Sequence, residues 1–134
     1  MRPLVHARAW LALWVLALVV VAVGSLLPPS ALPEAPRVSD KLVHVAMYFV
    51  LMAAAVQLFA STRALLVAAF ALAAFGLALE VAQGTLTTTR MFEWGDVLAN
   101  TLGVVLGLGL AATPLARSLL WLERRVLPRV GGRA

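Results

Sequence analysis

Four apolar stretches, with almost no charge inside them, set the limits on what this chain can fold into. They run from about residue 9 to 27, 42 to 60, 64 to 81 and 96 to 112. Each is close to the ~20 residues that a helix needs to cross about 30 Å of hydrocarbon. Hydrophobic residues make up 63% of the chain, against about half in a soluble domain. The sequence therefore predicts an all-α, polytopic membrane protein, a four-transmembrane-helix bundle that forms a single domain over residues 1–134.

The first stretch has a second interpretation as a signal peptide, because Arg2 and Arg8 precede it. Its apolar run is longer than the roughly 7–15 residues of a typical signal sequence. Pro28 and Pro29 stand where a cleavage site would carry small residues. We therefore predict a retained transmembrane helix.

Lysine and arginine residues are distributed unevenly between the two sides of the predicted bundle. Four spans place both termini and the turn at 61–63 on one side. That side holds Arg2, Arg8, Arg63, Arg117, Arg124, Arg125, Arg129 and Arg133. The other side holds Arg37, Lys41 and Arg90. The positive-inside rule then predicts a multi-pass membrane protein with both termini in the cytoplasm.

The net charge of +5 is compatible with nucleic acid or anionic lipid as a partner. Because the basic residues flank apolar segments, we expect membrane lipids as partners and no nucleic acid. The oligomeric state does not follow from the sequence.

Residues 113–134 form a basic tail that is expected to be cytoplasmic. Leu115, Leu119, Leu122 and Val126 within it share one helix face, with arginines on another. This pattern predicts a short basic helix at the membrane interface. A basic flank without a helix is equally compatible with it.

The chain contains no cysteine, which excludes disulfides and cysteine ligation of zinc or an iron–sulfur cluster. Asp40, His44, Glu80 and Asp96 offer a set of nitrogen and oxygen ligands for a metal. One histidine without cysteine binds divalent ions weakly. We therefore expect no metal and no cofactor.

The strongly polar residues of the four stretches gather at ends that lie on the same, extracytoplasmic side. Such residues within a membrane are costly and usually have a partner or a task. We predict that they form one ligand-binding cluster, made of Asp40, Lys41, His44, Tyr48, Glu80, Gln83, Arg90, Asp96 and Asn100.

Two members of this predicted cluster stand at expected helix N-termini. Asp40 and Asp96 there can satisfy free backbone N–H groups and the positive end of the helix dipole. Capping and site membership therefore both stay open for these carboxylates. His44 and Tyr48 follow Asp40 at one-turn intervals, so all three share a helix face. A carboxylate one turn away can set the tautomer of His44 and raise its basicity.

Glu80 has no capping role, because it stands near the expected C-terminal end of its helix, where the dipole disfavours negative charge. Glu80 also still lies within the apolar run, and a glutamate in such a segment should be protonated or lie close to a cation. Lys41 and Arg90 are the cations on that side, and Gln83 can donate a hydrogen bond to it. Glu80 is either one half of a structural ion pair or the centre of a functional site.

The fourth stretch carries Asn100, Gly103 and Gly107 on the same face as Asp96. Glycines at this spacing permit close helix approach, and an asparagine can hydrogen-bond across the contact. We predict that this face packs against a neighbouring helix.

Together these residues resemble the VanZ-like family of integral membrane proteins. The matching pieces are Ser39-Asp40-Lys41-x-x-His44-x-x-x-Tyr48, Gly76-x-x-x-Glu80-x-x-Gln83, Arg90, and Asp96-x-x-x-Asn100-x-x-Gly103. The resemblance implies a small membrane protein, and the namesake of the family is associated with low-level resistance to the glycopeptide teicoplanin. Family members commonly have glycine at the position of Thr89. A residue other than glycine allows fewer backbone conformations there, and this affects the shape of the loop that presents Arg90.

Three functions are compatible with this pattern. The first is a non-enzymatic envelope protein that binds a polar lipid, a lipid-linked cell-wall precursor or a glycopeptide at the outer face. The second is an intramembrane enzyme that uses Glu80 or His44 as the acid or base. The third is a small transporter, which the clustering of polar residues at one face makes the weakest of the three.

Overall fold

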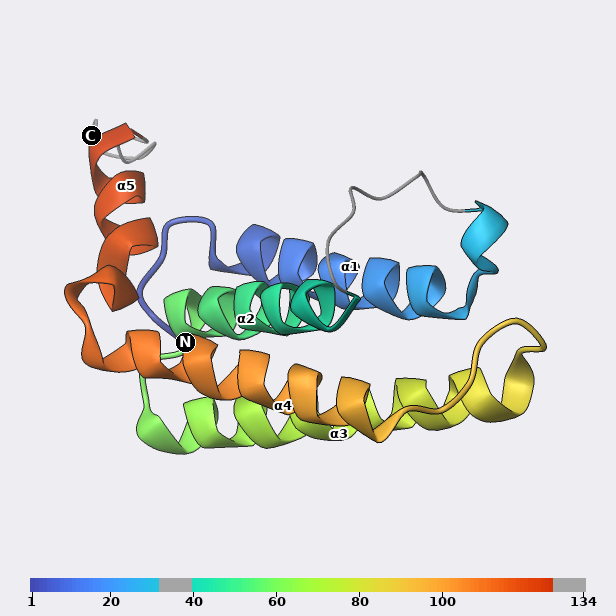
Figure 1. Ribbon diagram of the computed structural model, residues 1–134. Coiled ribbons are helices and arrows are strands. Elements are labelled where there is room, and N and C mark those ends of the chain that lie inside the picture. Colours follow the sequence, from blue (N-terminus) through green and yellow to red (C-terminus); the bar gives the residue numbers. More distant parts are fainter. Residues whose placement is uncertain (32–39, 127–134) are drawn as a thin grey trace.

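A computed structural model describes residues 1–31 and 40–126 of the chain, and these residues form helices joined by short connections, with no strand among them (Figure 1). The α-helices are α1 (Ala7–Leu26), α2 (Asp40–Leu58), α3 (Thr62–Leu86), α4 (Trp94–Gly109) and α5 (Ser118–Val126). The 3₁₀ turns are η1 (Pro29–Ala31), η2 (Leu110–Ala112) and η3 (Pro114–Arg117). The predicted all-α class is confirmed, and the last part of the basic tail, 127–134, lies outside the described residues.

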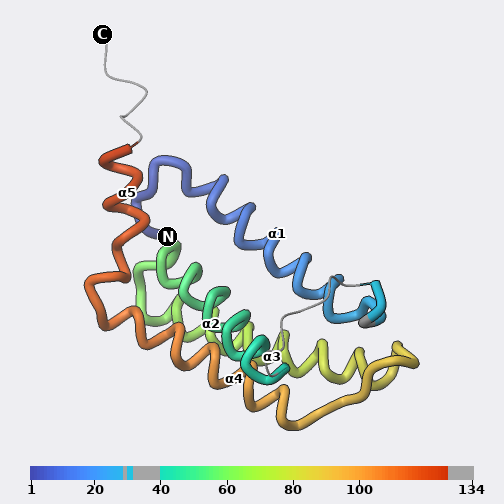
Figure 2. Tube along the Cα trace, turned by 45° about the horizontal axis from the view of Figure 1, so that its top comes forward, coloured from blue at the N-terminus to red at the C-terminus, as the bar shows by residue number. Residues whose placement is uncertain are grey.

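Four of these helices are long and apolar enough to cross a membrane, counting η2 as the continuation of α4. Their most apolar windows have mean hydropathies of 2.5, 1.7, 2.3 and 1.5 in chain order. They lie side by side along a common direction, and α5 turns across one end of them (Figures 1 and 2). The predicted bundle of four spans followed by a short C-terminal helix is therefore present.

Helix α2 is the centre of the bundle and contacts each of the other three long helices. Helix α1 packs on α2 and α3 but makes no contact with α4. The indole of Trp14 in α1 donates a hydrogen bond of 2.9 Å to the carbonyl of Leu51 in α2. This hydrogen bond joins α1 to the centre of the bundle.

The third helix is longer than its apolar run. The sequence predicts a span that ends at residue 81, whereas α3 continues to Leu86. The hydroxyl of Thr85 donates to the carbonyl of Val81 at 2.8 Å, and threonine and glutamine do not interrupt a helix. Hydropathy marks where an apolar segment stops, not where its backbone hydrogen bonds stop. The connection to α4 is consequently shorter than the loop expected over residues 82–95.

Helices α2 and α4 approach each other through two glycines of α4. A Cβ atom on Gly103 would collide with the carbonyl oxygen of Val45 and lie 2.9 Å from the backbone nitrogen of Phe49. A Cβ atom on Gly107 would lie 2.7 Å from the carbonyl oxygen of Phe49. Only glycine allows this backbone contact, so the predicted packing face of the fourth span is confirmed.

Candidate functional site

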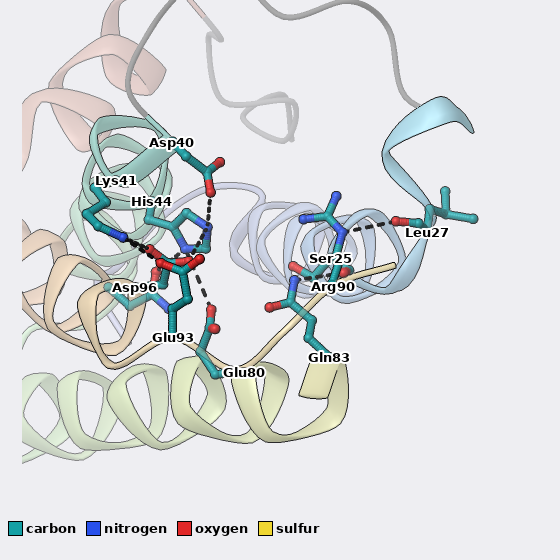
Figure 3. Close-up of polar contacts among 11 residues, drawn as sticks. Ser25, Leu27, Asp40, Lys41, His44, Glu80, Gln83, Arg90, Glu93 and Asp96 are labelled. Atoms are coloured by element: carbon teal, nitrogen blue, oxygen red, sulfur yellow. Dashed lines mark hydrogen bonds and ion pairs between the residues drawn. The ribbon is translucent and has the colours of Figure 1, made fainter. Parts of the chain in front are cut away.

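The polar residues of α2, α3 and α4 meet at one end of the bundle, here called the site end. It is the end where α2 and α4 begin and where α1 and α3 finish (Figure 1), and Figure 3 shows its polar side chains. Carboxylates from all three helices face one lysine and one histidine there. These residues, here called the acidic cluster, are Asp40, Lys41, His44, Glu80, Glu93, Asp96 and Asn100.

Lys41 joins the N-terminus of α2 to that of α4. Its Nζ atom donates to Glu93 Oε2 and to Asp96 Oδ1, both at 2.9 Å. Gly95 leaves the space that the lysine occupies, because a Cβ there would lie 2.8 Å from Nζ. Glu93 was absent from the predicted site. Its spacing of three residues from Asp96 at a helix start was the available signal, since residues so spaced share a face.

The two aspartates do not cap their helices in the expected way. Asp40 is the first residue of α2, and its side chain is 75% exposed. Asp96 lies in the first turn of α4, which begins at Trp94 with Glu93 in the cap position. Asp96 is buried. Both carboxylates face His44, Asp40 from within α2 and Asp96 from α4.

His44 is buried between carboxylates on both edges of its ring. Its Nδ1 atom makes a 2.9 Å hydrogen bond with Asn100 Oδ1 and lies 3.9 Å from Glu80 Oε1. Its Nε2 atom lies 3.8 Å from Asp96 Oδ2 and 4.0 Å from Asp40 Oδ2. The imidazole therefore connects all three helices that build the cluster.

Glu80 is 1% exposed and lies more than one turn before the end of α3. Neither expected cation reaches it, because Lys41 binds two other carboxylates and Arg90 bonds elsewhere. Gln83 does not donate to it either. His44 is its nearest basic group, and the second oxygen, Oε2, has no hydrogen-bond partner among the described residues. Glu80 is therefore a buried carboxylate with incomplete compensation.

Two more buried polar atoms lack partners in the described part of the chain. They are the hydroxyl of Tyr48 and Nδ2 of Asn100. Gly76 of α3 allows both side chains to pack closely, since a Cβ there would lie 3.1 Å from Asn100 and 3.2 Å from the Tyr48 ring. Buried polar atoms normally have partners, so these atoms have hydrogen-bonding capacity in reserve.

Gln83 and Arg90 belong to a second polar group beside the end of α1, here called the α1 group. Gln83 Nε2 donates to the carbonyl of Ser25 at 2.8 Å, and Arg90 Nε donates to that of Leu27 at 3.2 Å. The hydroxyl of Thr87 accepts from the backbone N–H of Arg90 at 3.2 Å. Figure 3 shows this group set apart from the carboxylates, with Glu80 pointing toward His44. Of the nine predicted site residues, six lie in the acidic cluster and two in the α1 group. The ninth, Tyr48, lies one turn after His44 in α2.

A buried carboxylate that the sequence did not indicate lies at the opposite end of the bundle. Glu123 of α5 is 2% exposed and accepts hydrogen bonds from the backbone N–H groups of Val5 and His6 at 2.7 and 3.2 Å. The indole N–H of Trp10 donates to it at 2.7 Å. Burial raises the pKa of this carboxyl, but the three hydrogen bonds outweigh burial and leave its pKa below the ordinary value.

Comparison with known proteins gives one match. A family model described as VanZ/LLP1 matches residues 5–117, which include every described residue of the acidic cluster and of the α1 group. No curated protein and no solved structure matches the chain.

Proposed function

Because the chain belongs to the VanZ/LLP1 family and has four membrane-spanning helices, we propose that it binds the polar group of a membrane lipid or lipid-linked ligand at the site end. The site end would face the outside of the bacterial cytoplasmic membrane, with both termini in the cytoplasm. This orientation is supported by the excess of arginine around the opposite end.

The observation that carries the proposal is the environment of Glu80. An ionised carboxylate in an apolar bundle is costly unless charge and hydrogen bonds compensate it. Glu80 has a histidine at 3.9 Å and an oxygen with no partner. A purely structural ion pair would instead be fully satisfied, as Lys41 satisfies Asp96 and Glu93. The unpaired atoms of Glu80, Tyr48 and Asn100 support a role in binding a polar ligand.

The α1 group supports a ligand with both positive and negative parts. Arg90 uses its Nε atom on Leu27, and its planar guanidinium can still bind a phosphate or carboxylate through the remaining N–H groups. The acidic cluster would take a cationic or hydrogen-bond-donating part of the same ligand. A lipid-linked cell-wall precursor has such chemistry, and an effect on teicoplanin susceptibility would follow if the bound ligand is one the antibiotic recognises.

An intramembrane enzyme is the second candidate, and the position of His44 favours it. An imidazole held between Glu80 and two aspartates is placed for proton transfer to a bound lipid headgroup. Consumption of a bound lipid, rather than its retention, would distinguish this candidate from the first.

The proposal is tested by replacing Glu80 with glutamine and measuring the lipids that remain bound to the purified protein by mass spectrometry. Glu123→Gln is the matched control, because it makes the same change at a buried carboxylate of the opposite end. We expect Glu80→Gln to stay folded and to lose a lipid that the wild type and Glu123→Gln both retain.

A different result would assign Glu80 to structure. Removing one partner of a buried charge pair typically costs about 3–5 kcal/mol of stability. A Glu80→Gln protein that is destabilised by that much, yet retains the same lipids as the wild type, would contradict the proposed function.

A further inference from the structure

We propose that Asp40, His44 and Asp96 form a binding site for a divalent transition-metal ion at the site end of the bundle. In the proposed function, this ion would hold an anionic oxygen of the ligand. Only this role of the ion rests on the proposed function, and the ion site itself does not. It also reverses the expectation from the sequence, where one histidine was judged too weak a ligand. In the structure, the contacts of His44 orient its ring for metal binding.

The ring of His44 is held with one nitrogen free to act as a ligand. Its Nδ1 atom faces two acceptors, Asn100 Oδ1 at 2.9 Å and Glu80 Oε1 at 3.9 Å. Carboxylates face both ring nitrogens at 3.8–4.0 Å, but among the described residues only Asn100 Oδ1 is within hydrogen-bond distance of the ring. With this oxygen as the acceptor, the proton lies on Nδ1 and the lone pair on Nε2. Histidines that bind metals are oriented in this way, with the other ring N–H donated to a carbonyl or carboxylate.

Three electron-pair donors converge on the Nε2 side of the ring. His44 Nε2 lies 3.8 Å from Asp96 Oδ2 and 4.0 Å from Asp40 Oδ2. One ligand atom from each of the three residues lies within 4.8 Å of the other two. Lys41 does not bridge them, because it binds the other oxygen of Asp96, Oδ1. In a tetrahedral site, ligands bonded at about 2.0–2.2 Å lie about 3.3–3.6 Å apart. His44 and Asp96, at 3.8 Å, are close to this separation, and Asp40 lies further away. The exposed side chain of Asp40 can close the remaining difference by a change of rotamer.

Glu80 is the independent observation that indicates a cation here. It is 1% exposed, it points toward the imidazole, and its Oε2 atom has no partner among the described residues (Figure 3). The acidic cluster contains four carboxylates and one lysine, and that lysine contacts only Glu93 and Asp96, whereas Asp40 and Glu80 contact His44. A cation on Nε2 would offset this excess, and Glu80 would stabilise the positive charge that the ion places on the ring.

The donor set indicates which ions fit. One imidazole nitrogen with two carboxylate oxygens is compatible with Zn²⁺ or Mn²⁺, whereas Mg²⁺ and Ca²⁺ favour oxygen ligands alone. Three protein ligands leave a coordination position for a further oxygen. With the ion bound, the cluster could accept a phosphate or carboxylate oxygen of the ligand. Without the ion, its carboxylates would repel that oxygen and take the cationic or hydrogen-bond-donating part instead.

The test is a Zn²⁺ titration of the full-length protein in detergent, without a histidine tag or added lipid, after treatment with EDTA. Binding is followed by calorimetry, and Mn²⁺ binding by electron paramagnetic resonance. Asp40→Asn removes an exposed ligand. Glu93→Gln is the control, because it removes an exposed carboxylate of the same cluster that lies outside the three ligands. Both variants are first checked for unchanged thermal unfolding.

We expect one saturable Zn²⁺ site in the wild type. The Zn²⁺ affinity of this site should be at least about tenfold lower in Asp40→Asn. A nearby surface charge changes such affinities by about fivefold at most, which is the limit expected for Glu93→Gln. Equal weakening in both variants, or no saturable binding, would overturn the ion site. If Zn²⁺ binds but Glu80→Gln retains the same lipids as the wild type, only the proposed function is contradicted. The two failures are therefore distinguishable.

Discussion

The two fully buried glutamates differ in how completely the protein satisfies them. Glu123 accepts three hydrogen bonds, whereas one oxygen of Glu80 has no partner among the described residues. Hydrogen bonds to a charged acceptor contribute about 1.5–3 kcal/mol each, and an unmet buried group costs a similar amount. Glu123 is therefore expected to stabilise the fold, and Glu80 to reduce its stability until a ligand or ion binds.

Replacing Glu123 with glutamine should lower stability and remove part of its pH dependence. The lowered pKa of Glu123 means that its contribution is complete above the ordinary value of 4.5 and is lost as the pH falls through the lowered value. We expect Glu123→Gln to lower the free energy of unfolding by about 1.5–3 kcal/mol at neutral pH. The NH₂ group of the glutamine would face N–H donors and could not accept their hydrogen bonds. Thermal unfolding in detergent from pH 7 to 3 would measure it. An equally steep acid transition in Glu123→Gln and the wild type would exclude this role.

Six of the seven members of the acidic cluster, all except Glu93, were recognisable in the sequence, but their partners were not. Asp40, His44, Glu80 and Asp96 stand out because charge is rare in apolar segments. Which cation meets which carboxylate depends on helix rotation and on where α3 ends, and periodicity does not determine either. Glu123 escaped prediction because it stands beside Arg124 and Arg125, where a glutamate normally faces water.

At the scale of elements, the contact between α2 and α4 holds the site together. Lys41 and His44 of α2 reach Asp96 and Asn100 of α4 because Gly103 brings the two backbones close one turn further along. This face was predictable from its spacing. The length of α3 was not, because its last turn is polar and its helical hydrogen bonds continue past the apolar run.

Gly103→Leu should separate α2 from α4 and reduce the amount of folded protein in the membrane. The first carbon of the new side chain would meet the backbone of Val45 and Phe49, which cannot move as a side-chain tip can. Overpacking typically costs about 1–3 kcal/mol. Gly109→Leu is the control in the same helix, because a Cβ there meets nothing within 4 Å. Equal accumulation of both variants, measured by immunoblot of membranes, would mean that the contact is absent.

For the whole molecule, the all-α class and the four spans followed from composition and segment length alone. The proposed orientation rests on a weaker statistical rule, the count of lysine and arginine on the two sides. The chain has no cysteine, so single introduced cysteines report the orientation without background.

Cysteine at Thr88 should react with a membrane-impermeant thiol reagent in intact cells, and cysteine at Thr62 should react only after the membrane is opened. Both positions are exposed and lie in or next to connections at opposite ends of α3. The reverse pattern of labelling would place the acidic cluster on the cytoplasmic side.

The hydrogen bonds of Glu123 also determine when the fold can be completed during synthesis. Val5 and Glu123 are separated by 118 positions. At about 5–20 residues per second, the ribosome needs roughly 6–24 s to travel between them. Until Glu123 has been translated, the N–H groups of Val5 and His6 cannot form these hydrogen bonds. The start of α1 is therefore secured by a residue that is translated after all four membrane-spanning helices.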